Sequence, residues 1–467
     1  MYDGVKLFLE IVGWFFVLYL LGYSTFLFLS VLTGSMELYK HARRERLKVL
    51  LPADDQLPIS IIVPAHNEEI TAVATVRSLL TLDYRAYEII VVDDGSTDDT
   101  ARVLTEAFGL HRIQRPIHRR VPCQREEAVY ESRSHKVPLT LICKKNGGKA
   151  DALNMGINAS RFPYFICMDA DSVLQHDSLR RIIQPVLEDE NVVAVGGLVR
   201  AANGVELENG RVRRWQLPRN LLVFMQTLEY DRSFLASRIL FDRFNGSMII
   251  SGAFGLFKKE TVVAVGGYER ETVGEDMELV VRLHEYCSAH GIGYAIRYAS
   301  DAVCWTQVPE RLGDLCRQRK RWHLGLFQSL NRHRDMFYDR RFGPVGFVSY
   351  LYFLIYELLS PLIEIFGVFT MVLAWWLDLI NVPFMLLFFG IYAAFGVILT
   401  LTVFFSRSLT AENRITLWDG LRAAALCVVE LVFLRFVLAW VRCVAFFGYR
   451  SKRLQWGQIQ RQRIDLN

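Results

Sequence analysis

The chain has 467 residues, of which 52% are hydrophobic and 22% charged, with a formal net charge of +5. Its mean hydropathy of +0.20 is high for a soluble protein, and its charged fraction is too large for a pure bundle of transmembrane helices. Together these values predict a soluble domain attached to a few membrane spans. Because membrane proteins concentrate Lys and Arg at their cytoplasmic faces, the positive charge requires no nucleic-acid partner.

The eight cysteines and ten histidines predict neither disulfide nor zinc chemistry. No two cysteines have Cys-x-x-Cys spacing, so we expect reduced cytosolic thiols. No His-Glu-x-x-His pattern occurs, which disfavours a zinc site.

The first predicted membrane span is the apolar run 11–32, about as long as the ~20 residues that cross a bilayer. It lacks the basic start and the small-residue cleavage site of a signal peptide. A basic segment follows, so the positive-inside rule places the N-terminus outside and the chain after residue 40 in the cytoplasm. The basic residues of this segment are Lys40, Arg43, Arg44, Arg46 and Lys48.

Short β-branched runs alternate with helical patterns from residue 58 to about 306. This alternation predicts a mostly parallel sheet covered by helices. Acidic residues follow two of the strands, at the carboxyl ends where open α/β sheets bind ligands. The predicted strands are 59–63, 87–92 and 164–168, and the predicted helices are 71–82, 98–108 and 177–187.

Two segments depart from this alternation. Residues 111–137 are basic and irregular, which predicts a solvated loop, with a contact to lipid headgroups as the alternative. Residues 205–244 carry an amphipathic pattern, which predicts helices on the membrane surface or against the spans.

The C-terminal third has two further predicted spans, 347–376 and 383–405, and a third apolar run, 421–447. Charged side chains at mid-bilayer cost at least ~2.5 kcal/mol each. A crossing by the third run would also place the basic tail that follows it outside, so we expect an in-plane or re-entrant element with both ends cytoplasmic. The charged residues of this run are Arg422, Glu430, Arg435 and Arg442.

Two polar motifs at the ends of predicted strands suit a nucleotide. Asp93 and Asp94 follow a strand, where they can accept hydrogen bonds from a uracil imide and ribose hydroxyls. Lys149 follows Gly147 and Gly148 at a helix start, where backbone N–H groups and its own charge suit an anion. Each motif also fits a plain turn with a helix cap. The spacing excludes a Walker P-loop.

The pair Asp169 and Asp171 predicts a metal site. In an extended segment, two residues separated by one point to the same side. Their carboxylates would then supply hard oxygen ligands for Mg²⁺ or Mn²⁺ together with a diphosphate. Aspartates with this spacing are also common in turns.

Two later motifs suit group transfer. Glu275 and Asp276 begin a helical run, where a carboxylate is held rigidly enough to act as a general base; an acidic first turn that complements the helix dipole is the alternative. Gln318, Arg321 and Trp322 lie in a basic helical segment. A guanidinium binds a diphosphate bidentately and an indole stacks on a sugar, although a cationic helix at the membrane surface has the same composition.

This combination of motifs resembles the processive family-2 glycosyltransferases, the group that contains cellulose, hyaluronan and poly-N-acetylglucosamine synthases. The resemblance covers about residues 57–330, but the Phe-x-Val-Thr-x-Lys gating loop of cellulose synthases is not found after Trp322. It implies donor binding, metal binding, acceptor binding and base catalysis at particular positions. By this resemblance, the donor-binding residues are Pro64, Asn67, Glu68, Asp93, Asp94, Lys149, Asp169 and Arg321, and the metal ligands are Asp169 and Asp171. It likewise implies that the acceptor-binding residues are Gln318, Trp322 and Glu275, and that the catalytic base is Asp276.

The resemblance implies an α/β GT-A-like cytoplasmic glycosyltransferase domain plus an α-helical transmembrane region. We expect an N-terminal transmembrane helix with its basic flank over 1–50, the GT-A domain with interfacial helices over 51–340, and C-terminal transmembrane or interfacial helices over 341–467. A multi-pass protein of the plasma (bacterial inner) membrane is expected, with its catalytic domain in the cytoplasm.

The implied function is inverting, processive polymerisation of UDP-N-acetylglucosamine or UDP-glucose into a β-linked polysaccharide that crosses the membrane. The implied partners are the UDP-sugar donor, the growing polysaccharide, membrane lipids and small membrane or export subunits, but no nucleic acid. Two alternatives stay open: non-processive transfer of a single sugar to a lipid carrier, and a catalytically inactive membrane receptor or platform.

Overall fold

A computed structural model describes residues 2–47, 57–132, 135–208, 210–409 and 415–446. Within these residues, ten strands form one mixed sheet in the order β3-β4-β5-β2-β1-β6-β11-β8-β12-β7, and β9 pairs with β10 separately. Neighbours β5, β2, β1 and β6 are parallel. The strands are β1 (Ile59–Ala65), β2 (Tyr87–Asp94), β3 (Leu110–Ile113), β4 (Glu126–Ser132), β5 (Leu139–Lys144), β6 (Tyr164–Cys167), β7 (Ser172–Leu174), β8 (Val192–Ala201), β9 (Val205–Glu208), β10 (Arg211–Trp215), β11 (Gly255–Lys258) and β12 (Ala295–Thr306).

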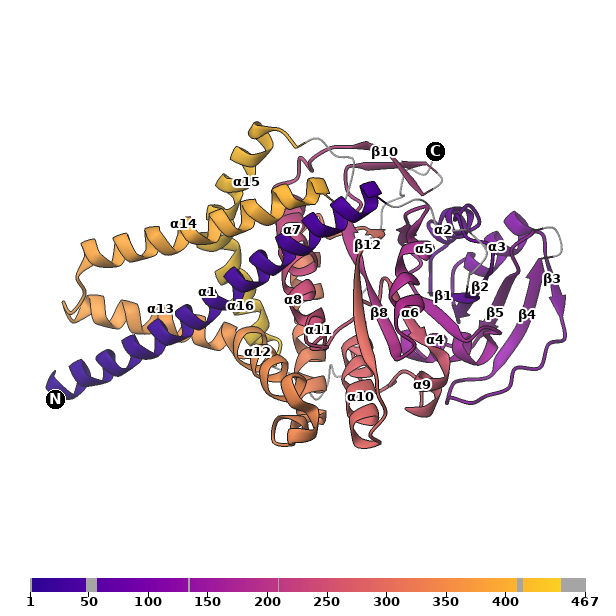
Figure 1. Ribbon diagram of the computed structural model, residues 1–467, viewed down its shortest axis with the longest axis horizontal. Coiled ribbons are helices and arrows are strands. Elements are labelled where there is room, and N and C mark those ends of the chain that lie inside the picture. The colour runs from indigo at the N-terminus through magenta and orange to yellow at the C-terminus, as the bar shows by residue number, and fades with distance from the viewer. Residues whose placement is uncertain (1, 48–56, 133–134, 209, 410–414, 447–467) are drawn as a thin grey trace.

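Helices cover the sheet, and a further set of helices extends away from one end of it (Figure 1). The predicted strands at 59–63, 87–92 and 164–168 are confirmed as β1, β2 and β6. The longer helices are α1 (Tyr2–Leu47), α2 (Ala72–Leu79), α3 (Thr100–Phe108), α4 (Lys149–Ala159), α5 (Ser178–Ile182), α6 (Gln184–Glu188), α7 (Leu221–Arg232), α8 (Arg238–Asp242), α9 (Lys259–Ala264), α10 (Glu275–Ala289), α11 (Leu312–Arg332), α13 (Ser360–Trp376), α14 (Val382–Ser406), α15 (Leu417–Val429) and α16 (Arg435–Val444).

Strand β1 shows how the sheet is buried on both faces. Its side chains alternate between the faces. Ile61 belongs to the apolar cluster that includes α2 and α3, whereas Ile62 belongs to the cluster that includes α4 and α10. A side chain at Gly156 would overlap Ile62, so α4 lies directly on β1. This contact places the start of α4 beside the carboxyl ends of the central strands.

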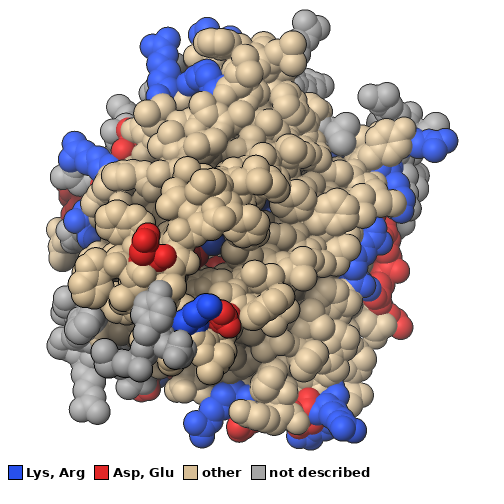
Figure 2. Space-filling model, turned by 90° about the vertical axis from the view of Figure 1, so that its left-hand side faces the viewer, with Lys and Arg blue, Asp and Glu red and all other residues tan. Residues whose placement is uncertain are grey.

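The helices at the other end of the molecule are apolar on their outer surfaces. Among the described residues, three helical stretches are long and apolar enough to cross a membrane: Gly4–Arg43, Val382–Ser406 and Leu417–Val444. Figure 2 views this end, where side chains other than Lys, Arg, Asp and Glu dominate the surface. Figure 2 also shows a hollow near the middle of this face, in which charged side chains are visible.

The predicted span at 347–376 is not one regular helix. Its two helical parts, 345–358 and 360–376, meet at an angle of 49°, as in a broken span or a re-entrant loop. Pro361 lies in the first turn of α13. Proline is tolerated there, but its ring clashes with the carbonyl one turn earlier and it has no N–H to donate, so the preceding helix cannot continue through it. A crossing by these two parts together stays a prediction, because a bent pair can form either a broken span or a re-entrant loop.

The third apolar run forms a continuous helical stretch through α15 and α16. By length and composition it could span a membrane, yet it lies crosswise to α1 and α14, as an in-plane element would (Figure 1). Two of its charges are paired: Arg435 Nη2 lies 2.8 Å from Glu364 Oε1, and Glu430 accepts a hydrogen bond of 3.1 Å from Arg232 Nη1. Residue 447 and the basic tail lie outside the described residues, so the in-plane placement stays a prediction.

The two irregular segments differ from their predictions in part. Residues 111–113 belong to β3, which pairs with β4, and residues 126–132 form β4, antiparallel to β5, so the prediction of a loop over 111–137 was wrong in both places. Strands β3 and β4 lie at the opposite end of the molecule from α13 and α14, which argues against a lipid contact (Figure 1). The helical prediction for 205–244 was wrong over 205–215, where β9 and β10 pair, and is confirmed from Leu221 onward by α7 and α8.

Candidate active site

The turn between β5 and α4 is held by Asp94. Its carboxylate accepts hydrogen bonds from the Lys144 ammonium, from Gly147 N at 3.0 Å and from Gly148 N at 2.7 Å. Lys144 is fully buried and also lies 3.0 Å from the buried Asp151 Oδ1. These contacts give Asp94 a structural use in shaping the glycine turn, in addition to the donor contact that the family resemblance implies. Sequence reasoning missed Lys144 and Asp151.

Asp93 has a different environment from its neighbour. Its carboxylate accepts hydrogen bonds from the backbone and the hydroxyl of Ser96. Burial raises the pKa of Asp93, and the hydrogen bonds from Ser96 oppose that rise. Each carboxylate oxygen has two lone pairs, so a buried carboxylate at a strand end can accept further hydrogen bonds from a ligand N–H or O–H.

The loop after β1 is joined to the loop after β2. Pro64 pairs with Val92 across the two parallel strands. Asn67, whose φ is +57°, accepts a hydrogen bond of 2.8 Å from Thr97 N through its side chain. Glu68 is buried: its N–H donates a hydrogen bond of 2.8 Å to the Thr100 hydroxyl, and its carboxylate accepts one of 2.6 Å from the Thr71 hydroxyl. The contacts of Asn67 and Glu68 hold the two loops in one arrangement beside Asp93.

Lys149 is the charge at the centre of the site. Its Nζ lies 2.5 Å from Asp169 Oδ1 and 3.7 Å from Glu275 Oε1. Burial disfavours its charged form, but Asp169 and Glu275 outweigh that effect and raise the pKa of Lys149. The lysine therefore stays positive where a diphosphate would need a cation. The site joins residues of α4, the loop after β6 and α10, which are far apart in sequence.

Asp276 lies beside this lysine. Its Oδ2 accepts a hydrogen bond of 3.2 Å from Gly252 N. A Cβ at Gly252 would lie 3.0 Å from Lys149 Nζ and 3.6 Å from Asp276 Oδ2. The missing side chain leaves space next to both groups, and nothing in the spacing of the sequence motifs pointed to Gly252.

Glu275 is more buried than Asp276. Burial raises its pKa, Lys149 and Arg321 oppose the rise, and Asp276 adds to it. Arg321 is half-buried on α11, and its charge reaches Glu275. The structure thus brings the predicted diphosphate ligand Arg321 to the same side as the predicted base.

Asp169 and Asp171 do not lie in an extended segment. Strand β6 ends at Cys167, and Ala170 and Asp171 form a turn before β7, so that part of the prediction was wrong. The Thr75 hydroxyl donates a hydrogen bond of 2.7 Å to Ala170 O and fixes the turn. Burial and the nearby charge of Asp169 raise the pKa of Asp171 to about 7.

These two carboxylates fit a divalent cation in their chemistry. Both offer oxygen ligands, which Mg²⁺ and Mn²⁺ prefer. Within the described part of the chain, no group of three or more His, Cys, Asp and Glu could hold a metal ion. Mg²⁺ is usually bound by one or two carboxylates together with substrate phosphates. The donor set therefore suits a cation that arrives with a nucleoside diphosphate.

Helix α11 carries the last motif along one wall of the site. Trp322 is 41% exposed, and Gln318 Oε1 is a buried acceptor without a hydrogen-bond partner among the described residues. An exposed ring and an unused acceptor on one helix are the features expected of a sugar-binding wall.

Helices α10 and α11 touch backbone to backbone. A Cβ at Gly325 would lie 2.7 Å from Gly274 Cα, which leaves no room for a side chain. Gln328 Oε1 accepts hydrogen bonds of 2.9 Å from the Thr272 hydroxyl and 3.0 Å from Val273 N. The close approach fixes the start of α10, and with it Asp276, against the helix that carries Trp322.

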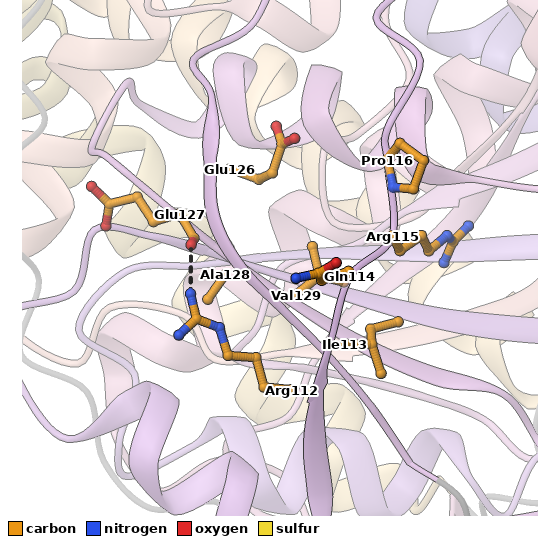
Figure 3. A pocket seen from close by; sticks show the side chains of 9 residues that line it. All are labelled: Arg112, Ile113, Gln114, Arg115, Pro116, Glu126, Glu127, Ala128 and Val129. Atoms are coloured by element: carbon orange, nitrogen blue, oxygen red, sulfur yellow. Dashed lines mark hydrogen bonds between the residues drawn. The ribbon is translucent and has the colours of Figure 1, made fainter.

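A separate open cavity of about 750 Å³ lies between residues 112–116 and 126–129. In Figure 3, Arg112 Nη2 donates a hydrogen bond of 3.5 Å to Glu127 O at this cavity. None of the predicted site residues lines it. It belongs to the edge of the sheet formed by β3 and β4.

The parallel strands with acidic loops at their carboxyl ends, together with α10 and α11, define a GT-A-like glycosyl-transfer domain joined to apolar helices. Residues 60–262 match the model of glycosyl transferase family 2, and residues 164–441 match that of glycosyl transferase family group 2. The chain belongs to the family-2 glycosyltransferases. The predicted fold class and family are confirmed.

Curated relatives include the poly-beta-1,6-N-acetyl-D-glucosamine synthase of Staphylococcus aureus (strain COL), 30% identical over 321 residues. The synthase of the same name from Staphylococcus epidermidis is 29% identical over 317 residues. Both matches cover 67% of this chain and 66% of the relative, just under two thirds of the relatives' length. A solved mannosyltransferase from Pyrobaculum calidifontis, in complex with GDP-Man and Mn²⁺, aligns at 18% identity and a TM-score of 0.49 over 89% of this chain and 99% of that one.

Gly325→Ala should lower sugar transfer by about 10²-fold, because displacing a catalytic group by about 1 Å has an effect of that size. The new Cβ would push against Gly274 and move Asp276. The measurement is sugar transfer alongside binding of the nucleotide, which should change little. Gly313→Ala is the matched control, since nothing lies within 4 Å of a Cβ at that position of the same helix. Equal activity of the two variants would contradict the positioning argument.

Lys144→Met should strongly destabilise the domain. It leaves the buried carboxylates of Asp94 and Asp151 without their shared cation, a loss of about 3–5 kcal/mol when one partner of a buried pair is removed. The measurement is thermal unfolding in detergent. Lys145→Met, at the exposed neighbouring position, is the control and should unfold like the wild type. An unchanged unfolding temperature for Lys144→Met would contradict the proposed network.

Proposed function

We propose that this protein polymerises UDP-N-acetylglucosamine into a β-linked polysaccharide at the cytoplasmic face of a membrane and passes the polymer across. The observation that carries the proposal is the meeting of Lys149 on α4, Asp169 after β6 and Asp276 on α10. The charge of Arg321 on α11 reaches Glu275 of the same site, and Trp322 is the next residue of that helix. The staphylococcal relatives are poly-beta-1,6-N-acetyl-D-glucosamine synthases, which supports N-acetylglucosamine as the sugar. UDP-glucose is the second donor to test.

The donor would bind along the carboxyl ends of β1, β2 and β6. Asp93 would accept hydrogen bonds from uridine, next to the loops held by Asn67 and Glu68. Lys149 and Arg321 would face the diphosphate. Asp169 and Asp171 would hold Mg²⁺ or Mn²⁺, which neutralises the charge that develops on the departing diphosphate.

Transfer would be a single displacement. Asp276 accepts the proton of the acceptor hydroxyl while the hydroxyl oxygen attacks the anomeric carbon. The bond from that carbon to the diphosphate oxygen breaks, and UDP leaves toward Lys149 and Arg321. Attack opposite the leaving group inverts the anomeric carbon, so an α-linked donor gives a β-linkage. Gln318, Glu275 and Trp322 would hold the acceptor sugar.

A polar track through the apolar helices supports passage of the polymer. The Tyr356 ring lies 5.1 Å from that of Tyr19, 5.5 Å from that of Tyr23 and 5.8 Å from that of Tyr352. The Tyr352 hydroxyl donates a hydrogen bond of 3.3 Å to Glu357 Oε1. Aromatic rings with hydroxyl groups offer a sugar chain both stacking and hydrogen bonds.

The track continues at both ends. Arg435, paired with Glu364, lies 5.8 Å from the centre of the Tyr23 ring. Glu357 interacts electrostatically with Arg319 and Glu229 on the side of the active site. Charged groups inside apolar helices are costly and commonly mark a transport pathway. The hollow in Figure 2 lies on the end of the molecule that the apolar helices form.

This function implies the arrangement expected from the sequence: a multi-pass protein of the plasma membrane with the domain 51–340 in the cytoplasm. Small membrane or export subunits fit the same arrangement. Transfer of one sugar to a lipid carrier would produce a single glycolipid and would not need the polar track. An inactive platform would release no UDP.

The test uses the full chain in lipid vesicles with a panel of UDP-sugars and Mg²⁺, Mn²⁺ or a chelator. We expect UDP release and a long polymer with UDP-N-acetylglucosamine, and loss of both with the chelator. A product of one sugar on lipid would favour the non-processive alternative. No release with any donor would favour the platform.

Asp276→Asn should nearly abolish transfer, by about 10²–10⁴-fold, because an amide cannot accept the proton. UDP binding should stay near the wild-type value, since the amide keeps the shape of the side chain. Polymer formation and UDP affinity are the measurements. Near-normal turnover would assign the base to another residue.

Tyr356→Leu should shorten the polymer clearly, whereas the rate of UDP release in the absence of acceptor should change little. The variant removes the ring shared by Tyr19, Tyr23 and Tyr352 while keeping an apolar side chain. Polymer length on gels and UDP release are compared with Tyr338→Leu, a control at a tyrosine that is 80% exposed. Unchanged polymer length would argue against this route.

A further inference from the structure

Arg319 lies between Gln318 and Arg321 on α11 and has no part in the transfer reaction as proposed. It is 3% exposed, which is rare for a charged side chain. Its guanidinium carbon lies 4.4 Å from the centre of the Trp322 ring. Its Nη2 donates a hydrogen bond of 2.7 Å to Glu229 Oε2 on α7. Residues three apart on a helix lie on the same face, which allows the stacking.

We propose that Arg319 is a positioning residue for the acceptor: it holds the Trp322 indole from one face so that the opposite face receives the terminal sugar of the polymer. The inference rests on the proposed polymerase function. A guanidinium stacked on an indole is attracted by the ring, and more strongly when water is excluded. The buried guanidinium covers one face, and the 41% exposure of Trp322 is the surface left for the ligand.

Glu229 fixes the guanidinium from the other side. Its carboxylate accepts the hydrogen bond of Arg319, and Glu357 interacts with the same guanidinium electrostatically. Glu229 lies in the last turns of α7, whose end is anchored on the apolar helices: Arg232 pairs with Glu430, and Asp231 lies 3.3 Å from Arg407 Nη1. The orientation of the indole is therefore tied to the membrane part of the protein through α7.

The geometry explains why arginine suits this position. Its planar group can stack on the indole and still donate to a carboxylate with N–H groups at its edge. Lysine keeps the charge but has no plane to stack. Methionine keeps much of the length and loses the charge.

The experiment compares Arg319→Met and Arg319→Lys with the wild type. The full chain in lipid vesicles receives UDP-N-acetylglucosamine and a short N-acetylglucosamine oligomer as acceptor. We expect Arg319→Met to raise the acceptor KM about tenfold, the size of a lost stacking contact. The rate at which water hydrolyses the donor and releases UDP, measured without acceptor, should stay within about twofold of the wild type. The acceptor KM of Arg319→Lys should fall between those of the wild type and Arg319→Met. Arg317→Met is the control, at an arginine of the same helix that is 56% exposed.

A double-mutant cycle separates positioning from general packing. If Arg319 acts through the ring, Arg319→Met should add nothing to the acceptor KM of Trp322→Ala. Glu229→Gln, which keeps size and hydrogen bonding, should raise the acceptor KM in the same direction and serves as the second test if Arg319→Met does not fold. Additive effects in the cycle, or an equal loss of water hydrolysis and sugar transfer, would overturn the inference while the polymerase function stands. Absence of acceptor-stimulated UDP release by the wild type would overturn both.

Discussion

The backbone contact between Gly274 and Gly325 is the constraint on which the rest of the site depends. Two helices that touch without side chains between them have little freedom to slide. One of them carries Asp276 in its first turn and belongs to the sheet domain; the other carries Trp322 and packs against α16. The proposed base and the proposed acceptor wall are therefore one rigid unit, whereas Asp93 and Lys149 sit on the sheet and its loops.

Charge is arranged around this unit in two layers. Lys144 neutralises Asp94 and Asp151 beneath the glycine turn and is closed to solvent. Lys149 lies above the turn between Asp169 and Glu275, where a ligand can reach it. The lower layer supports the backbone, and the upper layer is where the proposed diphosphate and its cation would bind.

The membrane part follows the same principle of pairing charges that are distant in sequence. Arg232 and Glu430 are 198 residues apart, and Arg435 and Glu364 are 71 apart. In the sequence, each of these charged residues taken alone suggests that its segment does not lie in an apolar environment. Paired, each partner stabilises the charged form of the other. The polar track and the α7 connection to Arg319 both arise from such long-range pairs.

The sequence alone determined the local features: the parallel strands with acidic ends, the helix starts at Lys149 and Glu275, the apolar helices and the family. These depend on periodicity and on short motifs, which act over a few residues. Tertiary structure decided that 126–132 is a strand, that the helix breaks before Pro361 and that Asp94 shapes a turn. It also decided that Gly252 lies beside Lys149 and Asp276, that Gly325 lies against Gly274, and that Arg319 stacks on Trp322. Each of these depends on which distant segment lies opposite, and neither spacing nor composition contains that information.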